Sequence, residues 1–468
     1  MNLPHLWLAA HALLALFASR HILLHKRQPR SALLWLVWVW LFPVAGSLLY
    51  LYFGLNRVGL APHRIVPQWH RGQSASFDSL AAAVAGTPMR KGNRVHLLVD
   101  GTKGYPAMLR AIQTARCTVD LQTYIFDLDA VGMVFLNALE DAARRGVRVR
   151  VLVDGIGAYG ARRSLKRRLD RAGGEARHYD RIFRQPLLNL RNHRKLLIAD
   201  GQVAFTGGLN ISRRFTKGAI ARLRDLKFLR RSRPAVRDVH FAFRGPIAMD
   251  LGDSFQTDWD HSGGHTGPVP KKRGTAAAAL GPSAVDGVAA RVVRSGPDED
   301  LERIYEVLLG ALAQAKRRVD LCTPYFIPDG PLLAVLRMLG YRGVRVRLFV
   351  PRVSDHPYVH WAGQEYYPDL LDAGVEIWEV GEPFIHTKLA VVDSHWLFLG
   401  SSNLDIRSFR LNFELNVETR SKALAGQATA LLEVYRAGAH KIHRSRLNRR
   451  PAWVRLRGAL VNLAAPYL

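Results

Sequence analysis

One short pattern occurs twice in this chain, and its repetition constrains the fold more than any other feature. The copies consist of His193, Lys195, Asp200 and the turn Gly207-Gly208-Leu209-Asn210, and of His386, Lys388, Asp393 and the turn Gly400-Ser401-Ser402-Asn403. Each copy reads H-x-K-x4-D, then an apolar run, then small residues that end in Asn. A period of about 200 residues is far longer than the roughly 20–50 residues of solenoid repeats. The sequence therefore predicts two duplicated domains.

The duplication extends beyond the two motifs. The segment 117–126 resembles 317–326, and the strand-like segment 145–153 resembles 342–350. In each copy such β-branched runs alternate with helical patterns, for example over residues 133–145, which is typical of α/β units around a mostly open sheet. The simplest assembly is a pseudo-twofold pair of α/β domains whose His-Lys motifs face one cleft.

The length of 468 residues is sufficient for two sizeable cores and additional segments. We expect the first repeated domain over residues 95–260 and the second over 286–440, with a linker rich in Gly, Pro and Ala over 261–285. A connecting segment over 58–94 precedes these domains, and a basic amphipathic tail over 441–468 follows them. In that tail Trp453, Leu456 and Leu460 recur at helical spacing among arginines, a pattern that suits a helix lying in a membrane interface.

Residues 1–57 are predicted to form a helical hairpin that crosses a membrane twice. The runs 1–19 and 32–55 contain no Asp, Glu, Lys or Arg, and each approaches or exceeds the ~20 residues that cross a bilayer core. A short basic turn with Lys26, Arg27 and Arg30 separates them. A cleaved signal peptide or a single re-entrant segment is the alternative, and the immediate second apolar run argues against the signal peptide. The distribution of charge leaves open which membrane face holds the repeated domains.

The chain carries 67 Lys and Arg against 38 Asp and Glu, a formal net charge of +29. Such an excess requires anionic partners, either nucleic acid or anionic lipid head groups. Because the predicted hairpin would hold the domains at a bilayer, we favour anionic membrane lipid and expect no nucleic-acid partner.

The paired motifs suit chemistry at a phosphodiester. One imidazole can attack phosphorus while the other protonates the leaving oxygen, and two ammonium groups can hold the phosphate charge. Residues two positions apart on a strand point to the same face, so each histidine is expected beside its lysine. The candidate catalytic set is therefore His193, Lys195, Asp200, His386, Lys388 and Asp393. Within it the two aspartates, which lie near a turn, are expected to orient the motif.

Four further polar residues are candidates for binding or orienting roles. Asn210 and Asn403 follow small residues that let the backbone approach a bound phosphate. Glu414, in the triplet Asn412-Phe413-Glu414, can accept the ring N–H of a catalytic histidine and fix its tautomer. Asp238 occupies the corresponding place in the first copy. No Cys/His cluster in the sequence has the spacing of a zinc site, so we expect neither a metal nor a cofactor.

Through these residues the chain resembles the phospholipase D superfamily, which is defined by two such His-Lys-Asp motifs. More narrowly, it resembles the bacterial cardiolipin synthases. The superfamily resemblance covers residues 95–440, and the narrower one adds the N-terminal hairpin, the segments 400–409 and 411–414, and the basic C-terminus.

The resemblance implies transfer of a phosphatidyl group between two phosphatidylglycerol molecules through a phosphatidyl-histidine, which gives cardiolipin and glycerol. It implies His193 as the nucleophile and His386 as the general acid and then base, although the residues alone do not distinguish the two. It also implies a multi-pass protein of the bacterial inner membrane. A phospholipase D-type hydrolase, another phosphatidyltransferase, a nuclease with the same motifs and a non-catalytic membrane scaffold remain alternatives.

Overall fold

The computed structural model describes residues 3–26, 29–54, 76–179, 190–216, 235–264, 283–297 and 300–463. Within these residues the chain divides into two compact units, one with the N-terminal helices and one with the chain from residue 76 onward. Both copies of the repeated motif lie in the second unit. The predicted linker over 261–285 falls largely outside the described residues, as does the connecting segment up to residue 75.

The N-terminal unit consists of consecutive helical segments. They are α1 (Leu3–His25), α2 (Pro29–Leu41), α3 (Pro43–Leu49) and the π-helical η1 (Tyr50–Gly54). Ala18 and Ile22 of α1 share a buried cluster with Val39 and Tyr50, and the Tyr50 hydroxyl lies 2.8 Å from Nδ1 of His21. The helices therefore pack against one another through a small core of their own.

The second uncharged run is not one continuous helix. Helix α2 has 13 residues and α3 has 7, because Pro43 lacks the N–H that a continuing helix needs and instead begins a new one. In the ranges given above, no helix combines the length and the apolarity that crossing a membrane requires. The two predicted membrane spans are therefore not confirmed.

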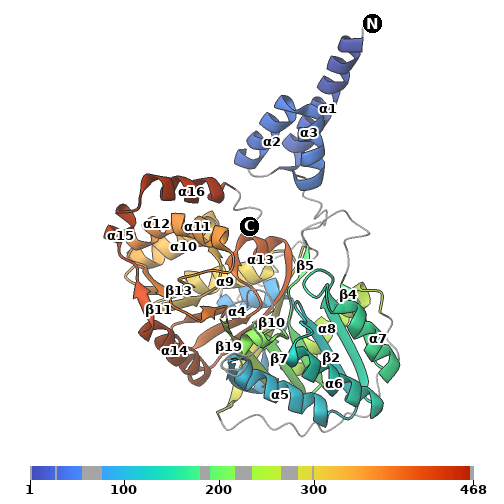
Figure 1. The fold of residues 1–468 in the computed structure, drawn as a ribbon. Helices are drawn as coiled ribbons and strands as arrows, with labels where there is room; N and C mark the ends of the chain where they lie inside the picture. Colours follow the sequence, from blue (N-terminus) through green and yellow to red (C-terminus); the bar gives the residue numbers. More distant parts are fainter. Residues whose placement is uncertain are drawn as a thin grey trace, which may run out of the picture. The chain divides into compact units, whose positions relative to one another are not determined.

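The second unit is built on a mixed sheet to which both halves of the chain contribute (Figure 1). The strands of the first half are β1 (Arg90–Val99), β2 (Thr118–Thr123), β3 (Arg148–Asp154), β4 (Glu175–Tyr179), β5 (Arg191–Asn192), β6 (Leu196–Ala199), β7 (Val203–Gly207), β8 (Val236–Arg237) and β9 (Val239–Arg244). Its helices are α4 (Phe77–Ala85), α5 (Asp100–Thr114), α6 (Ala130–Arg144), α7 (Arg162–Ala172), η2 (Arg213–Phe215) and α8 (Ile247–His261).

The second half repeats this series of elements. Its strands are β10 (Val285–Ser295), β11 (Arg318–Cys322), β12 (Phe326–Ile327), β13 (Arg345–Pro351), β14 (Glu376–Val380), β15 (Phe384–Ile385), β16 (Leu389–Val392), β17 (Trp396–Gly400), β18 (Leu404–Asp405), β19 (Asn412–Arg420) and β20 (Ala439–Lys441). Its helices are α9 (Arg303–Ala313), α10 (Gly330–Tyr341), α11 (Pro357–Gly363), η3 (Gln364–Tyr366), α12 (Tyr367–Asp372), α13 (Ile406–Arg410), α14 (Lys422–Ala437), α15 (Arg444–Asn448) and α16 (Ala452–Asn462).

The strand order agrees with the predicted pseudo-twofold relation between the halves. From edge to edge it is β20-β14-β13-β11-β16-β17-β19-β10-β1-β9-β7-β6-β2-β3-β4. The parallel strands β2, β3 and β4 of the first half correspond to β11, β13 and β14 of the second. The halves meet where β1 pairs antiparallel with β10. The two α/β domains are thus confirmed, but they share a continuous sheet.

Helices cover both faces of this sheet. Buried residues of α8 and α14 form one hydrophobic cluster, while those of α5, α6 and α7 form another, and those of α9, α10 and α12 a third. Leu415 and Val417 of β19 belong to the α8–α14 cluster. Because side chains alternate along a strand, Glu414 and Asn416 point to the opposite face.

The repeated sequence segments also place equivalent ion pairs in the two halves. Arg150 of β3 donates to Asp120 of β2 at 2.7 Å, and Arg347 of β13 donates to Asp320 of β11 at 2.6 Å. Both pairs are buried, so loss of one partner would leave an uncompensated charge. The similarity of segments 117–126 and 317–326 therefore reflects a shared core as well as shared chemistry.

Candidate active site

Each motif histidine follows a short strand that pairs with the other half of the chain. Strand β5, just before His193, runs parallel to β19, and the His193 N–H donates to the Phe413 carbonyl at 2.9 Å. Strand β15, just before His386, runs parallel to β8, and the His386 N–H donates to the Arg237 carbonyl at 2.7 Å. Backbone pairing across the halves therefore fixes both histidines.

The carboxylate partners of the histidines are exchanged between the halves. Nδ1 of His193, in the first half, lies 3.0 Å from both carboxylate oxygens of Glu414 in the second. Nδ1 of His386, in the second half, lies 2.6 Å from Oδ2 of Asp238 in the first. Both carboxylates are fully buried, while each imidazole side chain keeps 11% of its surface exposed. The two halves therefore form a composite site.

These contacts select one tautomer of each ring. A carboxylate accepts a hydrogen bond from Nδ1–H, so Nε2 is the nitrogen left for chemistry. Lys388 Nζ also lies 2.9 Å from Nδ1 of His386, but the shorter contact to the Asp238 carboxylate determines the position of the proton. Lys388 instead donates to the His386 carbonyl at 2.5 Å, and Lys195 donates to the His193 carbonyl at the same distance.

Burial lowers the pKa values of the two motif histidines and the two motif lysines, which favours their neutral forms. It lowers the pKa of Lys195 to about 7 and also lowers that of Lys388. It lowers the pKa of His193, an effect that the charge of Glu414 opposes, and it lowers the pKa of His386 further with help from the nearby Lys388 ammonium. A bound phosphodiester anion would raise all four pKa values, because it favours the charged forms.

The two carboxylates differ in their surroundings. Glu414 accepts hydrogen bonds from the Ser401 hydroxyl and, at 3.1 Å, from the Asn412 amide. Burial alone would raise the pKa of Glu414, but the neighbouring His193, the Lys195 ammonium and the Ser401 hydroxyl bring it below its usual value. Asp238 is the equivalent carboxylate of the first half, where Gly208 stands at the position that Ser401 occupies in the second half. Burial raises the pKa of Asp238 to about 7. A Cβ at Gly208 would lie 2.2 Å from the Asp238 carboxylate oxygens, so only glycine fits there.

The two motif aspartates bind backbone rather than lining the site. Asp200 accepts from the N–H groups of residues 116, 117 and 118 at 2.7–3.2 Å. Asp393 accepts from those of residues 316, 317 and 318 at 2.8–3.0 Å. Both residues have positive φ, 52° and 48°, as expected for tight turns. This geometry fits an orienting role and removes the aspartates from the group that would contact a substrate.

The two asparagines are buried but differ in their contacts. Oδ1 of Asn210 accepts from the Ile125 N–H at 3.0 Å, and its carbonyl accepts from the Tyr105 hydroxyl at 2.6 Å. The Asn403 N–H donates to the Ser408 hydroxyl at 3.2 Å. Its side-chain oxygen has no hydrogen-bond partner among the described residues. The unpaired atom is a hydrogen-bond acceptor, so it can receive a hydrogen bond from a substrate hydroxyl, whereas a phosphate oxygen requires a donor.

The sequence patterns did not predict several residues of the site. Arg194 is buried and donates to Asp258 at 2.6 Å, to the Glu414 carbonyl at 3.0 Å and to the Ser295 carbonyl at 3.1 Å. It therefore ties the first motif to β10 and β19 of the second half. The available signal for Arg194 was its charge at a position between His193 and Lys195. Alternation along a strand, however, predicts only that the Arg194 side chain points away from the face that carries His193 and Lys195.

Two tyrosines flank the imidazoles. The Tyr124 ring meets the His193 ring edge-on with centroids 5.1 Å apart, and the Lys195 ammonium lies 5.8 Å from the same ring. The Tyr325 ring lies 6.2 Å from the His386 ring, and its hydroxyl donates to Asp355 at 2.7 Å. The sequence contained a signal for both, since they occupy adjacent positions in the repeated segments 117–126 and 317–326.

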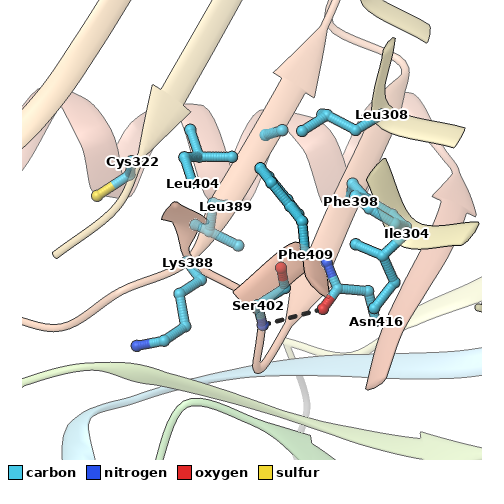
Figure 2. A pocket seen from close by; sticks show the side chains of 11 residues that line it. Ile304, Leu308, Cys322, Lys388, Leu389, Phe398, Ser402, Leu404, Phe409 and Asn416 are labelled. Atoms are coloured by element: carbon cyan, nitrogen blue, oxygen red, sulfur yellow. Dashed lines mark hydrogen bonds between the residues drawn. The ribbon is translucent and has the colours of Figure 1, made fainter. Parts of the chain in front are cut away.

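A small cavity lies next to the second motif (Figure 2). Its volume is about 20 Å³, and it is lined by Ile304, Leu308, Cys322, Lys388, Leu389, Ala390, Phe398, Ser402, Leu404, Phe409 and Asn416. The Lys388 side chain extends its ammonium away from the apolar lining, and the Ser402 N–H donates to Asn416 at 3.2 Å. Such a volume holds about one water molecule, so this cavity is not where a phospholipid binds.

Comparison with known proteins identifies the family. The family described as cardiolipin synthase, phospholipase D-like domain, matches residues 108–229 and 308–435, once in each half. A second family, described as the phospholipase D-nuclease N-terminal region, matches residues 13–54.

Curated relatives agree with these matches over most of the chain. The major cardiolipin synthase ClsA of Bacillus subtilis is 30% identical over 97% of this chain and 99% of its own length. Cardiolipin synthase 1 of Bacillus anthracis is 32% identical over 84% of this chain and 80% of its own. Among solved structures, the phosphatidylserine synthase of Haemophilus influenzae has the same fold, with a TM-score of 0.59 and 15% identity over 80% of this chain and 95% of its own. The chain belongs to the cardiolipin synthase family of proteins with paired phospholipase D-like domains.

Proposed function

We infer that the chain is a cardiolipin synthase, a phosphatidyltransferase of the phospholipase D type. The observation that carries this inference is the composite site, in which two His-Lys pairs and two buried carboxylates meet across the halves. The family membership and the full-length relatives supply the substrate class. Two molecules of phosphatidylglycerol react to give cardiolipin and glycerol.

In the first step Nε2 of one histidine attacks the phosphorus of a phosphatidylglycerol. The bond from phosphorus to the head-group glycerol oxygen breaks, and the other histidine, protonated, gives its proton to that oxygen. Glycerol leaves, and a phosphatidyl-histidine remains. The carboxylate behind each ring stabilises the positive charge that the imidazole gains.

In the second step the free hydroxyl of another phosphatidylglycerol attacks the phosphatidyl-histidine. The histidine that served as the acid now removes the hydroxyl proton, the P–N bond breaks, and the new P–O bond completes cardiolipin. One phosphodiester replaces another, so the exchange is close to balanced and needs no nucleotide cofactor. Lys195 and Lys388 stabilise the charged phosphorane oxygens.

The carboxylate environments favour His193 as the nucleophile. A phosphatidyl-histidine carries a positive charge that persists between the two steps. Glu414 has two side-chain donors and a lowered pKa, so it remains ionised behind His193. The raised pKa of Asp238 makes the carboxylate behind His386 easier to protonate. His386 then serves as general acid and base, Asn403 and Asn210 help to form the phosphate pocket, and Asp200 and Asp393 orient the motifs.

The N-terminal unit serves as the membrane anchor in this proposal. Large apolar side chains are exposed along α1, α2 and α3: Leu13, Leu16, Phe17, Leu23, Leu24, Leu33, Leu34, Trp38, Trp40, Leu41 and Leu48. A soluble domain rarely exposes so continuous an apolar surface to water. Lipid acyl chains can cover this surface and remove it from water. We therefore place the enzyme at the bacterial inner membrane as a multi-pass protein, with phosphatidylglycerol and anionic lipid as partners and no nucleic acid.

The test is product analysis by mass spectrometry with the purified full-length chain. Phosphatidylglycerol is supplied in mixed micelles containing EDTA, because the two lysines can replace a metal. Cardiolipin with an equal amount of glycerol is the expected result. Phosphatidic acid as the sole lipid product would make the protein a hydrolase, and no turnover would overturn the proposal.

A further inference from the structure

The C-terminal helix α16 exposes a stripe of large apolar side chains. Its members are Trp453, Leu456 and Leu460, with Leu463 one position past the helix, and they are 64%, 62%, 59% and 72% exposed. At about 100° per residue these positions share one side of the helix. The buried Gly458 and the half-buried Val454 and Val461 lie on the other side. The stripe is therefore not the side by which α16 joins the core.

The opposite side of α16 is firmly packed. Val461 contacts a small cluster that contains Ile327, Val359 and Ala362. The Tyr366 hydroxyl donates to Oδ1 of Asn462 at 3.0 Å. Helix α16 is thus seated on α11 (Figure 1) and on η3, and the exposed stripe is a fixed surface of the folded chain.

The charge around the stripe is positive. Arg449, Arg450, Arg455 and Arg457 lie in or just before the helix. The Arg457 guanidinium lies 3.9 Å from the centre of the Trp361 ring and 5.3 Å from that of Trp453, at the border of the stripe. Long cationic side chains that flank an apolar face and carry their charge to the head-group level are typical of interfacial helices. A second copy of this chain, whose net charge is +29, would meet electrostatic repulsion at the same surface.

We propose that α16 docks on an anionic lipid bilayer through the stripe Trp453–Leu456–Leu460–Leu463. The contact is separate from the N-terminal anchor and belongs to the catalytic unit itself. Its binding energy comes from apolar burial to a depth of about 5–10 Å and from attraction of the arginines to anionic head groups.

Docking through α16 would also bring the active site to its lipid substrates, an inference that rests on the proposed function. The cluster under α16 includes Tyr325 at its edge, and the Tyr325 ring lies 6.2 Å from that of His386. The docked helix and the catalytic histidine thus share a supporting segment. Docking would hold the His386 side of the site at the lipid surface from which both substrates come.

Lipid-borne quenchers provide the direct test, independent of catalysis. The full-length chain, with Cys117→Ser and Cys322→Ala to remove the free thiols, carries a fluorophore through Leu456→Cys. It is reconstituted into vesicles of phosphatidylglycerol and phosphatidylethanolamine that contain spin-labelled lipid. The matched control carries the label through Val434→Cys on α14, where an apolar residue is 58% exposed.

Severalfold stronger quenching at position 456 than at 434, reduced when phosphatidylcholine replaces phosphatidylglycerol, is the expected result. Equal quenching at the two positions overturns the proposal. So does a label at 456 that is shielded from lipid and self-quenched by a neighbouring copy, because the stripe would then be a protein interface.

A second arm joins docking to turnover. Leu456→Asp with Leu460→Asp should lower the rate severalfold on phosphatidylglycerol in vesicles, leave the rate in mixed micelles near that of the unmodified chain, and leave Val434→Asp normal in both. Equal rates in vesicles refute the link between docking and catalysis. A wild-type chain that turns over no phosphatidylglycerol would instead refute the proposed function, while the quenching result still decides the docking.

Discussion

The exchanged carboxylates make a quantitative prediction for Glu414→Gln. The substitution keeps the shape of the side chain and removes the charge that lies 3.0 Å from Nδ1 of His193. Coulomb's law gives about 4 kcal/mol for unit charges about 4 Å apart at an effective dielectric constant of ~20. That stabilisation is available to the imidazolium-like transition state and largely absent for neutral His193. Since about 1.4 kcal/mol corresponds to a tenfold change in rate, we expect kcat to fall by about a hundredfold to a thousandfold.

The assay measures glycerol release from phosphatidylglycerol in micelles, together with the Tm. Glu418→Gln is the matched control, because Glu418 is buried on the same strand and accepts from Trp396 at 3.1 Å without contacting a catalytic histidine. That variant should lose stability and keep kcat per folded molecule within a few-fold. A folded Glu414→Gln enzyme with wild-type kcat would refute the role assigned to the carboxylate.

The remaining predictions concern the rest of the mechanism and the two units. His193→Ala and His386→Ala should each abolish turnover, and near-normal activity of either would contradict the paired mechanism. The pH profile of kcat/KM should be a narrow bell near neutrality. Activity should rise as the Asp238 carboxyl, with a pKa of about 7, ionises and can accept a hydrogen bond from His386. It should fall at higher pH as the Lys195 ammonium, also with a pKa of about 7, loses its proton. Lys195→Arg should widen the alkaline side, and a profile that is flat across neutrality would count against these assignments. Asp200→Asn should lower stability by about 1–3 kcal/mol, because buried backbone N–H groups lose an acceptor, and should leave kcat per folded molecule within tenfold; a large loss of kcat at unchanged Tm would return Asp200 to the catalytic set. Removal of residues 1–57 should release the chain from membranes more than it reduces turnover of micellar lipid, and loss of both would make the N-terminal unit part of the catalytic fold.

Much of the fold could be predicted because the sequence contains an internal repeat, so its two copies can be compared with each other. Matching segments in two copies identified the α/β repeat, the motif residues and even the carboxylates Glu414 and Asp238. The exchange of these carboxylates between the halves could not be predicted, because it depends on how β5 pairs with β19 and β8 with β15. Local patterns do not encode pairing between strands so far apart in sequence.

The two predicted membrane spans are not confirmed, and the reason is local. Composition predicted a continuous span over 32–55, but Pro43 interrupts it, and a count of apolar residues does not register that effect. The sequence did not single out Arg194, because alternation along the strand says only that its side chain points away from those of His193 and Lys195. The structure buries it beside Asp258 and two carbonyl groups, and only these tertiary contacts make that burial acceptable.

The most direct test of the central claim is to trap and map the covalent intermediate. The full-length chain is mixed with phosphatidylglycerol, quenched rapidly without acid, digested and analysed by mass spectrometry. A phosphatidyl group on His193, absent in His193→Ala and formed more slowly in Glu414→Gln, is the predicted result. An adduct on His386 would reverse the assigned roles. Cardiolipin formation with no adduct on either histidine, even within a single turnover, would contradict a covalent mechanism at the composite site.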